Sequence, residues 1–506
     1  MEPQNPNSSS NQEQQNPSRQ LFSSSFSEQN MHQIPEITLP KGGGALKGID
    51  EKFQVNPVNG TNSVSIPLPV SPARAGFSPS LGLQYSSGAG NGLFGLGWGL
   101  GVPSIRRKTD KQLPQYQDNI DSDTYILAGA EDLIPKLEKS TTTQEWNVLE
   151  KTITFQGVDY LVKQYRPRIE GAWIRIERWT SLVDSMIHWR TISTNNTVTV
   201  YGIDDNSRIS NPTNPLQVFE WLIAYTYDNM GNIICYDYKK ENLVGVDRTI
   251  YEKNRNLTNV TNRYLKRVHY GNRDHYTHGD TLPTSTGFLF ETVLDYGEHD
   301  ALAPSPEEIV GQVWEARKDA FSSFRSGFDI RTYRLCKRVL LFHKFDAPTD
   351  QPIDNLLVSA LELKYESFPE ENISDPDLEG FTYLKEALSI GYEYNTSTNT
   401  YKTATTPPMS FYYQGHEWNT EIKTLEETSL EHSPTGINNS GYNWTDFYGE
   451  GISGILTEQN QAWYYKENLG KLYGKKVIIF SLIGFVIAII SLLISNVIAE
   501  TFHSFY

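Results

Sequence analysis

Residues 81–101 read LGLQYSSGAGNGLFGLGWGLG, and this stretch combines eight glycines with bulky apolar side chains. Pure Gly/Ser tracts stay flexible because they bury nothing. Here Phe94 and Trp98 stand among leucines and supply apolar surface, while glycines at alternate positions permit tight bends and close backbone approach. We therefore expect a hydrophobic segment packed on a β core, with Trp98 buried because Gly97 and Gly99 leave room on either side.

A ligand-cradling loop is the alternative interpretation of this segment. The order G-x-G-x-x-G occurs only loosely, at Gly90, Gly92 and Gly95, and no strand–helix–strand unit surrounds it. A dinucleotide site requires that unit, so the sequence argues against one.

Composition narrows the class of protein. The chain has 506 residues, 44 basic and 60 acidic, with a net charge of −16, which argues against a general nucleic-acid binder. Aromatic residues make up 12%, and they favour the half-buried faces of sheets. The two cysteines, Cys235 and Cys336, fit buried thiols better than a disulfide framework, although one disulfide would be possible by count.

Strand-and-turn units repeat between about residues 124 and 300. In Tyr225–Asn232, YTYDNMGN, two strands flank a turn in which Gly231 is expected at positive φ. Ser305–Phe321 is the one helix-compatible stretch, since Ser305 and Glu308 fit a capping box, and a surface loop is its alternative. Residues 1–34 are rich in Gln, Asn, Ser and Pro and lack an apolar signal-peptide core, which predicts a disordered tail.

The order of short motifs resembles the N-terminal module shared by SpvB and the B components of insecticidal toxin complexes. The matching runs are LPKGGGA (39–45), GT (60–61), IP (66–67), WGL (98–100), IRR (105–107), AG (128–129) with DL (132–133), and the segments 165–179, 324–345 and 405–413. The resemblance implies a mainly β fold of curved antiparallel sheets, like the wall of an RHS-repeat shell. YTYDNMGN also resembles an RHS-type tyrosine–aspartate repeat.

The resemblance divides the chain into parts. Residues 35–330 form the SpvB-like β module, 331–415 add strands of the same scaffold, and 416–470 resemble one partial propeller-like blade. Related blade loops often bind calcium through several aspartates. Only Asp446 is well placed here, with Tyr448 and Glu450 on either side of Gly449, whereas calcium needs six or more oxygens. We expect no metal site.

Residues 477–499, VIIFSLIGFVIAIISLLISNVIA, contain no charge and are long enough to span a bilayer as a helix. Lys471, Lys475 and Lys476 precede them, so positive-inside logic would place residues 1–470 in the cytoplasm. By resemblance the protein would be secreted or remain in the bacterial cytoplasm. The family continues instead into more blades and an RHS shell, or into an ADP-ribosyltransferase domain. A truncated or rearranged reading frame and a true membrane anchor both fit this tail.

Searches for chemistry find no catalytic, cofactor-binding or metal-ligating residue set. The Glu-x-Glu pair of SpvB-type ADP-ribosylation is absent, as are phosphate-loop, zinc-protease and serine-hydrolase motifs. His343 fits a core histidine, and the basic cluster Arg106–Lys108 is expected to be solvated or paired. Four further arginines alternate along 166–178 and are expected to pair with Glu170 and Glu177; they are Arg166, Arg168, Arg175 and Arg178.

These observations predict a non-enzymatic scaffold part of a bacterial toxin, a virulence factor that helps form a β shell enclosing or delivering a toxic polypeptide. The partners implied by the resemblance are a pore-forming A component and an RHS-type C component, with the membrane possible through 477–499. Two alternatives stay open: a membrane-anchored β-rich binding protein, and a remnant of an ADP-ribosylating toxin without its catalytic domain.

Overall fold

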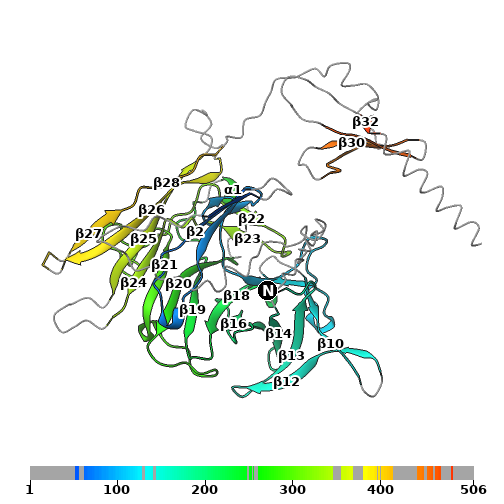
Figure 1. Cartoon of the computed structure of the whole chain (residues 1–506), viewed down its shortest axis with the longest axis horizontal. Coiled ribbons are helices and arrows are strands. Elements are labelled where there is room, and N and C mark those ends of the chain that lie inside the picture. The colour runs from blue at the N-terminus through cyan, green and yellow to red at the C-terminus, as the bar shows by residue number, and fades with distance from the viewer. Residues whose placement is uncertain are drawn as a thin grey trace, which may run out of the picture.

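The structure, a computed structural model shown in Figure 1, is built almost entirely of β-strands. It describes residues 52–55, 62–127, 132–140, 144–171, 173–247, 250–253, 255, 260–345, 355–367, 380–395, 397–398, 400–413, 442–448, 453–459, 462–468 and 480–481. Within this part the α-helix α1 (Ile250–Lys253) has four residues. The mainly β prediction is confirmed, as the aromatic and β-branched strand pattern favours.

Eighteen strands form the main sheet. Successive strands along the chain pair antiparallel, as in β12 with β13 and β25 with β26. The strands are β7 (Ser104–Arg107), β8 (Tyr125–Leu127), β9 (Asp132–Pro135), β12 (Glu150–Phe155), β13 (Val158–Pro167), β14 (Arg175–Ser181), β15 (Ile187–Ile192), β16 (Val198–Tyr201), β17 (Arg208–Asn211), β18 (Asn214–Tyr227), β19 (Ile233–Lys240), β20 (Arg263–Asn272), β21 (Phe288–Asp295), β24 (Arg338–His343), β25 (Leu356–Ser367), β26 (Thr382–Asn395), β27 (Thr400–Thr405) and β28 (Met409–Ser410).

Part of this sheet closes on itself into a barrel-like ring. The pairings run β7–β8–β9–β13–β14–β15–β16–β18 and return from β18 to β7, where Trp221 lies opposite Ile105. Closure removes the unpaired edges that an open sheet of these strands would have. Because side chains alternate along a strand, Ile187 and Trp189 of β15 enter the ring core, and His188 and Arg190 point to the outer face.

Of the remaining strands, β17 pairs with β18 outside the ring. The others continue from the ring as a wall, and Figure 1 shows β20, β21, β24, β25 and β26 side by side; the strands of the wall are β19, β20, β21, β24, β25, β26, β27 and β28. A second sheet with the order β1–β2–β3–β6 lies against it; its strands are β1 (Lys52–Val55), β2 (Asn62–Pro67), β3 (Gly82–Ser86) and β6 (Trp98–Leu100). The hairpin of β4 (Asn91–Gly92) and β5 (Gly95–Leu96) belongs to the same glycine-rich segment.

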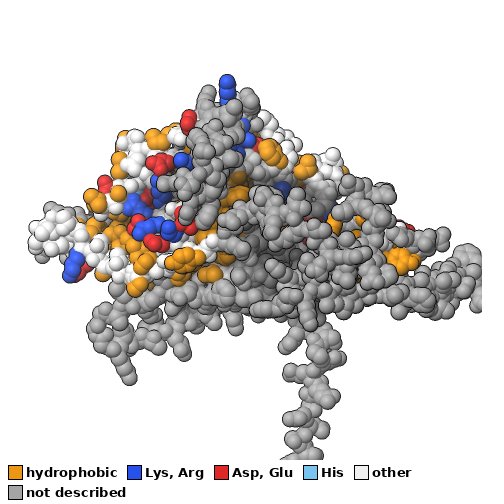
Figure 2. All heavy atoms as spheres, turned by 90° about the horizontal axis from the view of Figure 1, so that it is seen from above, with side chains coloured by type: hydrophobic (Ala, Val, Ile, Leu, Met, Phe, Trp, Pro, Cys, Tyr) orange, Lys and Arg blue, Asp and Glu red, His pale blue; other side chains and the backbone are white. Residues whose placement is uncertain are grey.

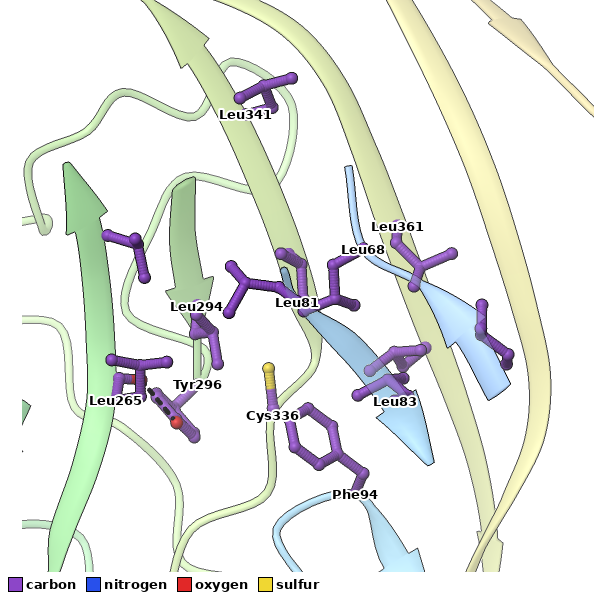
Figure 3. Packing of buried hydrophobic residues seen from close by; sticks show 14 of the residues in the cluster. Leu68, Leu81, Leu83, Phe94, Leu265, Leu294, Tyr296, Cys336, Leu341 and Leu361 are labelled. Carbon is purple, nitrogen blue, oxygen red and sulfur yellow. Dashed lines mark hydrogen bonds between the residues drawn. The ribbon is translucent and has the colours of Figure 1, made fainter. Parts of the chain in front are cut away.

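The largest hydrophobic core lies between these two layers. Figure 3 shows Leu68, Leu81 and Leu83 from the N-terminal layer facing side chains of the wall. The wall contributes residues such as Leu265, Leu294, Leu341 and Leu361, all 5% exposed or less. The glycine-rich segment 81–101 and the residues just before it therefore cover one face of the wall, which we call its inner face.

Smaller sheets complete the described part. β10 (Leu137–Lys139) pairs with β11 (Trp146–Val148), and β22 (Phe321–Ser323) pairs with β23 (Ile330–Thr332). A separate sheet has the order β29 (Tyr442–Thr445), β30 (Gly454–Gln459), β31 (Ala462–Lys466) and β32 (Phe480–Ser481). Three of these strands, β29 to β31, lie within residues 416–470, where the sequence predicts strands.

Two predictions about the ends of the chain fall largely outside the described residues: the disordered tail 1–34 and the helix 477–499. Phe480 and Ser481 are the exception, and they form β32 beside Lys466 and Tyr465 rather than a helix. No helix in the described ranges combines the length and the apolar character needed to cross a membrane.

The helix-compatible stretch Ser305–Phe321 forms turns and bends that end at β22, so its loop alternative is the one observed. Ser305 Oγ donates to the Glu307 carbonyl, and the Glu308 carboxylate pairs with Lys239 Nζ at 2.7 Å instead of capping a helix. Tertiary ion pairing overrides the local capping signal here. The predicted turn at Gly231 is confirmed, since its φ is 80° and Tyr227 pairs with Ile233.

Candidate functional site: the glycine-rich segment and the buried charges around it

Trp98 anchors the glycine-rich segment to the wall. It is 2% exposed, and its Nε1 donates to Tyr413 Oη at 2.8 Å. Tyr413 in turn donates to the Leu384 carbonyl of β26. The rings of Tyr85 and Phe411 lie 5.2 and 4.9 Å from the Trp98 ring. The predicted burial of Trp98 is confirmed.

Three glycines of the segment are required by their surroundings, and a fourth is not. A Cβ on Gly92 would lie 2.2 Å from the Trp98 carbonyl oxygen. Gly95 has φ 91°, and a Cβ there would lie 2.8 Å from the Thr382 carbonyl oxygen of β26. Gly97 has φ 80°, and a Cβ there would lie 2.5 Å from the Tyr85 ring. A Cβ on Gly99 would meet nothing within 4 Å, so the prediction that Gly99 leaves room beside Trp98 is wrong.

Arg317 and Asp319 clamp this segment to the wall. Arg317 donates to the Asn91 side chain at 2.8 Å and also to Asp319, while Asn91 Nδ2 donates to Asp319 at 2.9 Å. Asp319 accepts two further hydrogen bonds from the backbone and hydroxyl of Thr382. Burial by itself would raise the pKa of Asp319, but Arg317 and the other donors outweigh it and lower the pKa to about 2. One carboxylate thus joins three distant chain segments.

A second charge cluster lies in the ring. Arg107 is 0% exposed and pairs with Asp118 at 2.8 Å and Asp123 at 2.7 Å, both from the β7–β8 connection. Its Nε donates to the Val218 carbonyl of β18. Burial would raise the pKa of Asp118, but the hydrogen bond and charge of Arg107 lower it. Of the basic cluster predicted to be solvated or paired, Arg107 and Lys108 are paired, and Lys108 Nζ lies 2.6 Å from Asp132.

The arginines alternating along β13 and β14 have separate roles. Arg178 points into the ring, where it pairs with Asp121 at 2.7 Å, and Lys163 reaches the same carboxylate at 2.6 Å. Arg175 pairs with Glu177, as expected. The Glu170 carboxylate accepts a hydrogen bond from the backbone N–H of Trp173 at 2.8 Å, whereas an ion pair with an arginine was expected. Arg168 is exposed and lies 3.7 Å from Asp132.

His343 and the two cysteines have structural environments. His343 Nε2 lies 2.7 Å from Ser71 Oγ, which joins the wall to the N-terminal layer. Cys235 and Cys336 are buried free thiols, which confirms the thiol interpretation. Burial raises the pKa of Cys235 to about 12. Neither thiol therefore has the lowered pKa of a reactive cysteine.

The surface carries mixed charge. Figure 2 shows basic and acidic side chains next to one another on the visible face, with hydrophobic side chains between them. Lys364 pairs with Glu386 at 3.2 Å and Lys385 with Glu366 at 3.0 Å across β25 and β26. On this face, charges of both signs are therefore interspersed.

Within the described ranges no group of three or more His, Cys, Asp or Glu residues is arranged to hold a metal ion. Asp446 follows β29, and Glu450 lies outside those ranges. The prediction that the chain holds no catalytic, cofactor-binding or metal-ligating residues stays a prediction. The geometry supports a structural role. Buried ion pairs hold the β7–β8 connection onto the ring, and the glycine-rich segment packs on the inner face of the wall.

Residues 56–345 match the family model described as "Salmonella virulence plasmid 65kDa B protein", and this range is more than half of the chain. The chain belongs to the SpvB family. Mono(ADP-ribosyl)transferase SpvB of Salmonella choleraesuis (strain SC-B67) is 34% identical over 354 residues, 69% of this chain and 57% of that relative. The same values hold for the SpvB of Salmonella typhimurium (strain 14028s / SGSC 2262).

Solved structures of this family and of toxin complexes share the fold. The N-terminal domain of effector protein SpvB from Salmonella typhimurium strain LT2 matches with a TM-score of 0.56 and 33% identity, over 65% of this chain and 98% of that one. The crystal structure of TcdB2-TccC3 matches with a TM-score of 0.67 and 28% identity, over 89% of this chain and 21% of that one. The Photorhabdus luminescens Tc holotoxin pore matches with a TM-score of 0.68 and 28% identity, over 90% of this chain and 20% of that one.

These comparisons confirm the resemblance and correct one prediction. The expectation that the protein is not an enzyme is contradicted, because its curated SpvB-family relatives are named mono(ADP-ribosyl)transferases. The chain spans 57% of the length of those relatives. The absence of a Glu-x-Glu pair is therefore not a sufficient reason to exclude enzymatic activity for a member of this family.

Sequence reasoning missed three residues that organise the structure. Asp319 and Arg317 stand in an irregular stretch with no strand or motif signal, and only the tertiary fold brings Asn91 beside them. Arg190 follows the pattern of an outward strand residue, yet it is 4% exposed. Alternation predicts the face of a strand on which a residue lies, but not whether another segment covers that face.

Proposed function

We propose that this chain is a scaffold part of a bacterial toxin, which helps to build a β shell around a second, toxic polypeptide. The observation that carries this proposal is the match to TcdB2-TccC3 over 89% of the chain at 28% identity. The barrel-like ring and the sealed inner face support it, because a container wall needs closed edges and a stable inner layer. The proposal includes three parts of the chain: a β module that ends at residue 330, further strands of the same scaffold to residue 415, and a partial propeller-like blade at 416–470.

The partners proposed are an RHS-type C component and a pore-forming A component. The test co-expresses the full chain with a C component, and measures co-elution and the rate at which a protease digests the C component. We expect co-elution and slower digestion. Gly99→Ala is the matched folded control and should behave as the natural chain does. A C component that elutes alone and is digested at an unchanged rate contradicts the scaffold proposal.

A second candidate function is a role in mono(ADP-ribosyl) transfer. The names of the curated relatives favour it, and the chain spans 57% of their length. In this case the β module would accompany or deliver a transferase. Transfer of labelled ADP-ribose from NAD to proteins of a cell lysate, measured with the full chain, distinguishes the two. Label above that of a heat-denatured sample supports the transferase role, and its absence together with a protected C component supports the scaffold.

A further inference from the structure

Arg190 is a buried cation with an unusual set of partners. It lies on the outer face of the ring, 4% exposed, with its guanidinium 3.7 Å above the Trp179 ring and 4.7 Å from the Phe155 ring. Its Nε donates to His188 Nε2 at 3.3 Å, and its Nη1 lies 3.2 Å from His278 Nε2. Both contacts require that the imidazole nitrogen accept, so both histidines must be neutral.

No carboxylate hydrogen-bonds to Arg190 within the described part of the chain, and its Nη2 is buried without a hydrogen-bond partner. Glu177 lies opposite Arg190 in the β14–β15 register. Its two oxygens, however, accept from Arg175 and from Trp179 Nε1. A buried charge without a directly bonded counter-ion is costly, so the neutral imidazole acceptors matter more here than they would at a paired arginine.

His278 connects this arginine to a covering segment, residues 273–287 between β20 and β21. The His278 ring stacks between Phe155 at 4.7 Å and Tyr227 at 5.4 Å, with interplanar angles of 12° and 10°. Its Nδ1 lies 2.9 Å from Tyr227 Oη. The neighbouring Tyr276 is 5% exposed and belongs to the core cluster on this face.

Both ends of this segment bond to Lys344, since Arg273 Nη2 donates to the Lys344 carbonyl and Lys344 Nζ donates to the Ser285 carbonyl at 3.3 Å. Two further hydrogen bonds lie close to His278. Tyr276 N donates to the Gly231 carbonyl at 3.0 Å, and Gln156 Nε2 donates to the Gly279 carbonyl at 2.9 Å. His278 itself is exposed at the rim, so a proton from solvent reaches its ring without unfolding of the core. The stacked imidazole is therefore both a main attachment of the segment and accessible to titration.

We propose that His278 is an acid-sensitive latch, which holds residues 273–287 over the outer face of the ring near neutral pH and releases them when its ring is protonated. Protonation removes the acceptor for Arg190 Nη1 and places two cations at hydrogen-bond distance. Release uncovers the aromatic surface formed by Phe155, Trp179 and Tyr227. Stacking on Phe155 and Tyr227 remains available to the protonated ring, but it does not replace the lost acceptor.

Groups of both charge signs lie around His278. Arg190 of β15, Tyr227 of β18 and the uncharged Phe155 of β12 contact its ring. His188 bonds to Arg190, and Glu177 of β14, Tyr225 of β18 and Tyr160 of β13 lie near Arg190. On its own segment, Asp280 is exposed and accepts from Thr277 N, and Asp274 is exposed. Burial first, and the charge of Arg190 second, lower the pKa of His278 below its usual 6.5. A closed form that favours the neutral ring loses stability as the pH falls below about 6.5.

Hydrogen exchange of the full chain tests the latch, with protection factors corrected for the intrinsic effect of pH. We expect protection of the peptide covering 272–280 to fall on the order of tenfold between pH 7.5 and pH 5.0, while peptides of β25 and β26 stay protected. His278→Gln keeps a neutral acceptor and should abolish the fall. His275→Gln is the matched control and should keep the fall, because His275 lies on the same segment and it is His278, not His275, that contacts Arg190.

Three outcomes would overturn the proposal. Protection of 272–280 could be equal at both pH values in the natural chain, His278→Gln could lose protection as the natural chain does, or His275→Gln could abolish the response. Arg190→Met supplies an independent arm: without the cation the pH response of the covering segment should shrink, with burial of the ring as its remaining cause. Far-UV circular dichroism at both pH values keeps local release distinguishable from general unfolding.

Discussion

Replacing Gly95 by alanine tests the most specific feature of the glycine-rich segment. Gly95 opens β5 and lies directly against β26. Its φ of 91° lies where L side chains are strained, and the new Cβ would stand 2.8 Å from the Thr382 carbonyl oxygen and 3.3 Å from Leu384 N. Both neighbours are backbone atoms of a long central strand, so neither can turn aside as a flexible side chain would.

The expected cost is the sum of two effects. Holding an alanine at positive φ costs about 1–2 kcal/mol. Forcing an extra carbon into a packed contact costs about 1–3 kcal/mol. Gly95→Ala should therefore lower the free energy of unfolding by about 2–5 kcal/mol. Gly99→Ala is the matched control, since its Cβ meets nothing within 4 Å and its φ lies outside the left-handed range; it should be neutral or stabilise by about 0.4–1 kcal/mol.

Equilibrium unfolding in urea, followed by tryptophan fluorescence and by circular dichroism, measures both variants at one pH. A Gly95→Ala midpoint within error of the natural chain would refute the close approach of this segment to β26. Equal losses in the two variants would refute the argument differently, because the cost would then belong to glycine replacement in general and not to the contact with Thr382.

Three further outcomes are expected. Trp98→Ala should cost about 3–5 kcal/mol of unfolding free energy in the same urea assay, because the ring is buried and bonded to Tyr413; a change near zero would place the segment in solvent. Asp319→Asn should destabilise at pH 7 and differ progressively less from the natural chain between about pH 4 and pH 2, since the folded pKa of about 2 lies below the usual 3.8 and the stabilisation is lost as the pH falls through it; a difference that persists unchanged in acid-unfolding curves to pH 2 contradicts this. Cys235 and Cys336 should resist an aromatic disulfide reagent at pH 8 in the native protein and react in denaturant, and rapid native labelling would contradict their burial.

Local features of this fold are predictable from the sequence because local physics decides them. The turn at Gly231 follows from the spacing of Tyr227 and Ile233, and the burial of Trp98 follows from its apolar neighbours. Strand alternation also predicts which residues of β15 share a face. Each of these depends on residues close in the chain, for which turn geometry and the strand repeat are sufficient.

Closure of the ring depends instead on pairs that are far apart in sequence. Ile105 lies opposite Trp221, and Leu133 opposite Pro167, and no local pattern specifies either pair. The same limit applies to Arg107, whose sequence neighbours leave both a solvated and a paired basic cluster open. Its burial depends on two aspartates that a connection folds back onto it, a tertiary result that local patterns do not contain.

Four buried arginines show why partner type, and not burial, determines the response to acid. Three of them pair with carboxylates. Arg107 pairs with Asp118 and Asp123, Arg178 with Asp121, and Arg334 with Glu241. The pKa values of Asp118 and Asp121 are lowered because their cations outweigh the effect of burial, so these pairs persist in mild acid. Arg190 is bonded to two imidazoles, which titrate nearest to neutral pH. Acidification to pH 5 should therefore leave the ring closed and act first on the segment that His278 holds.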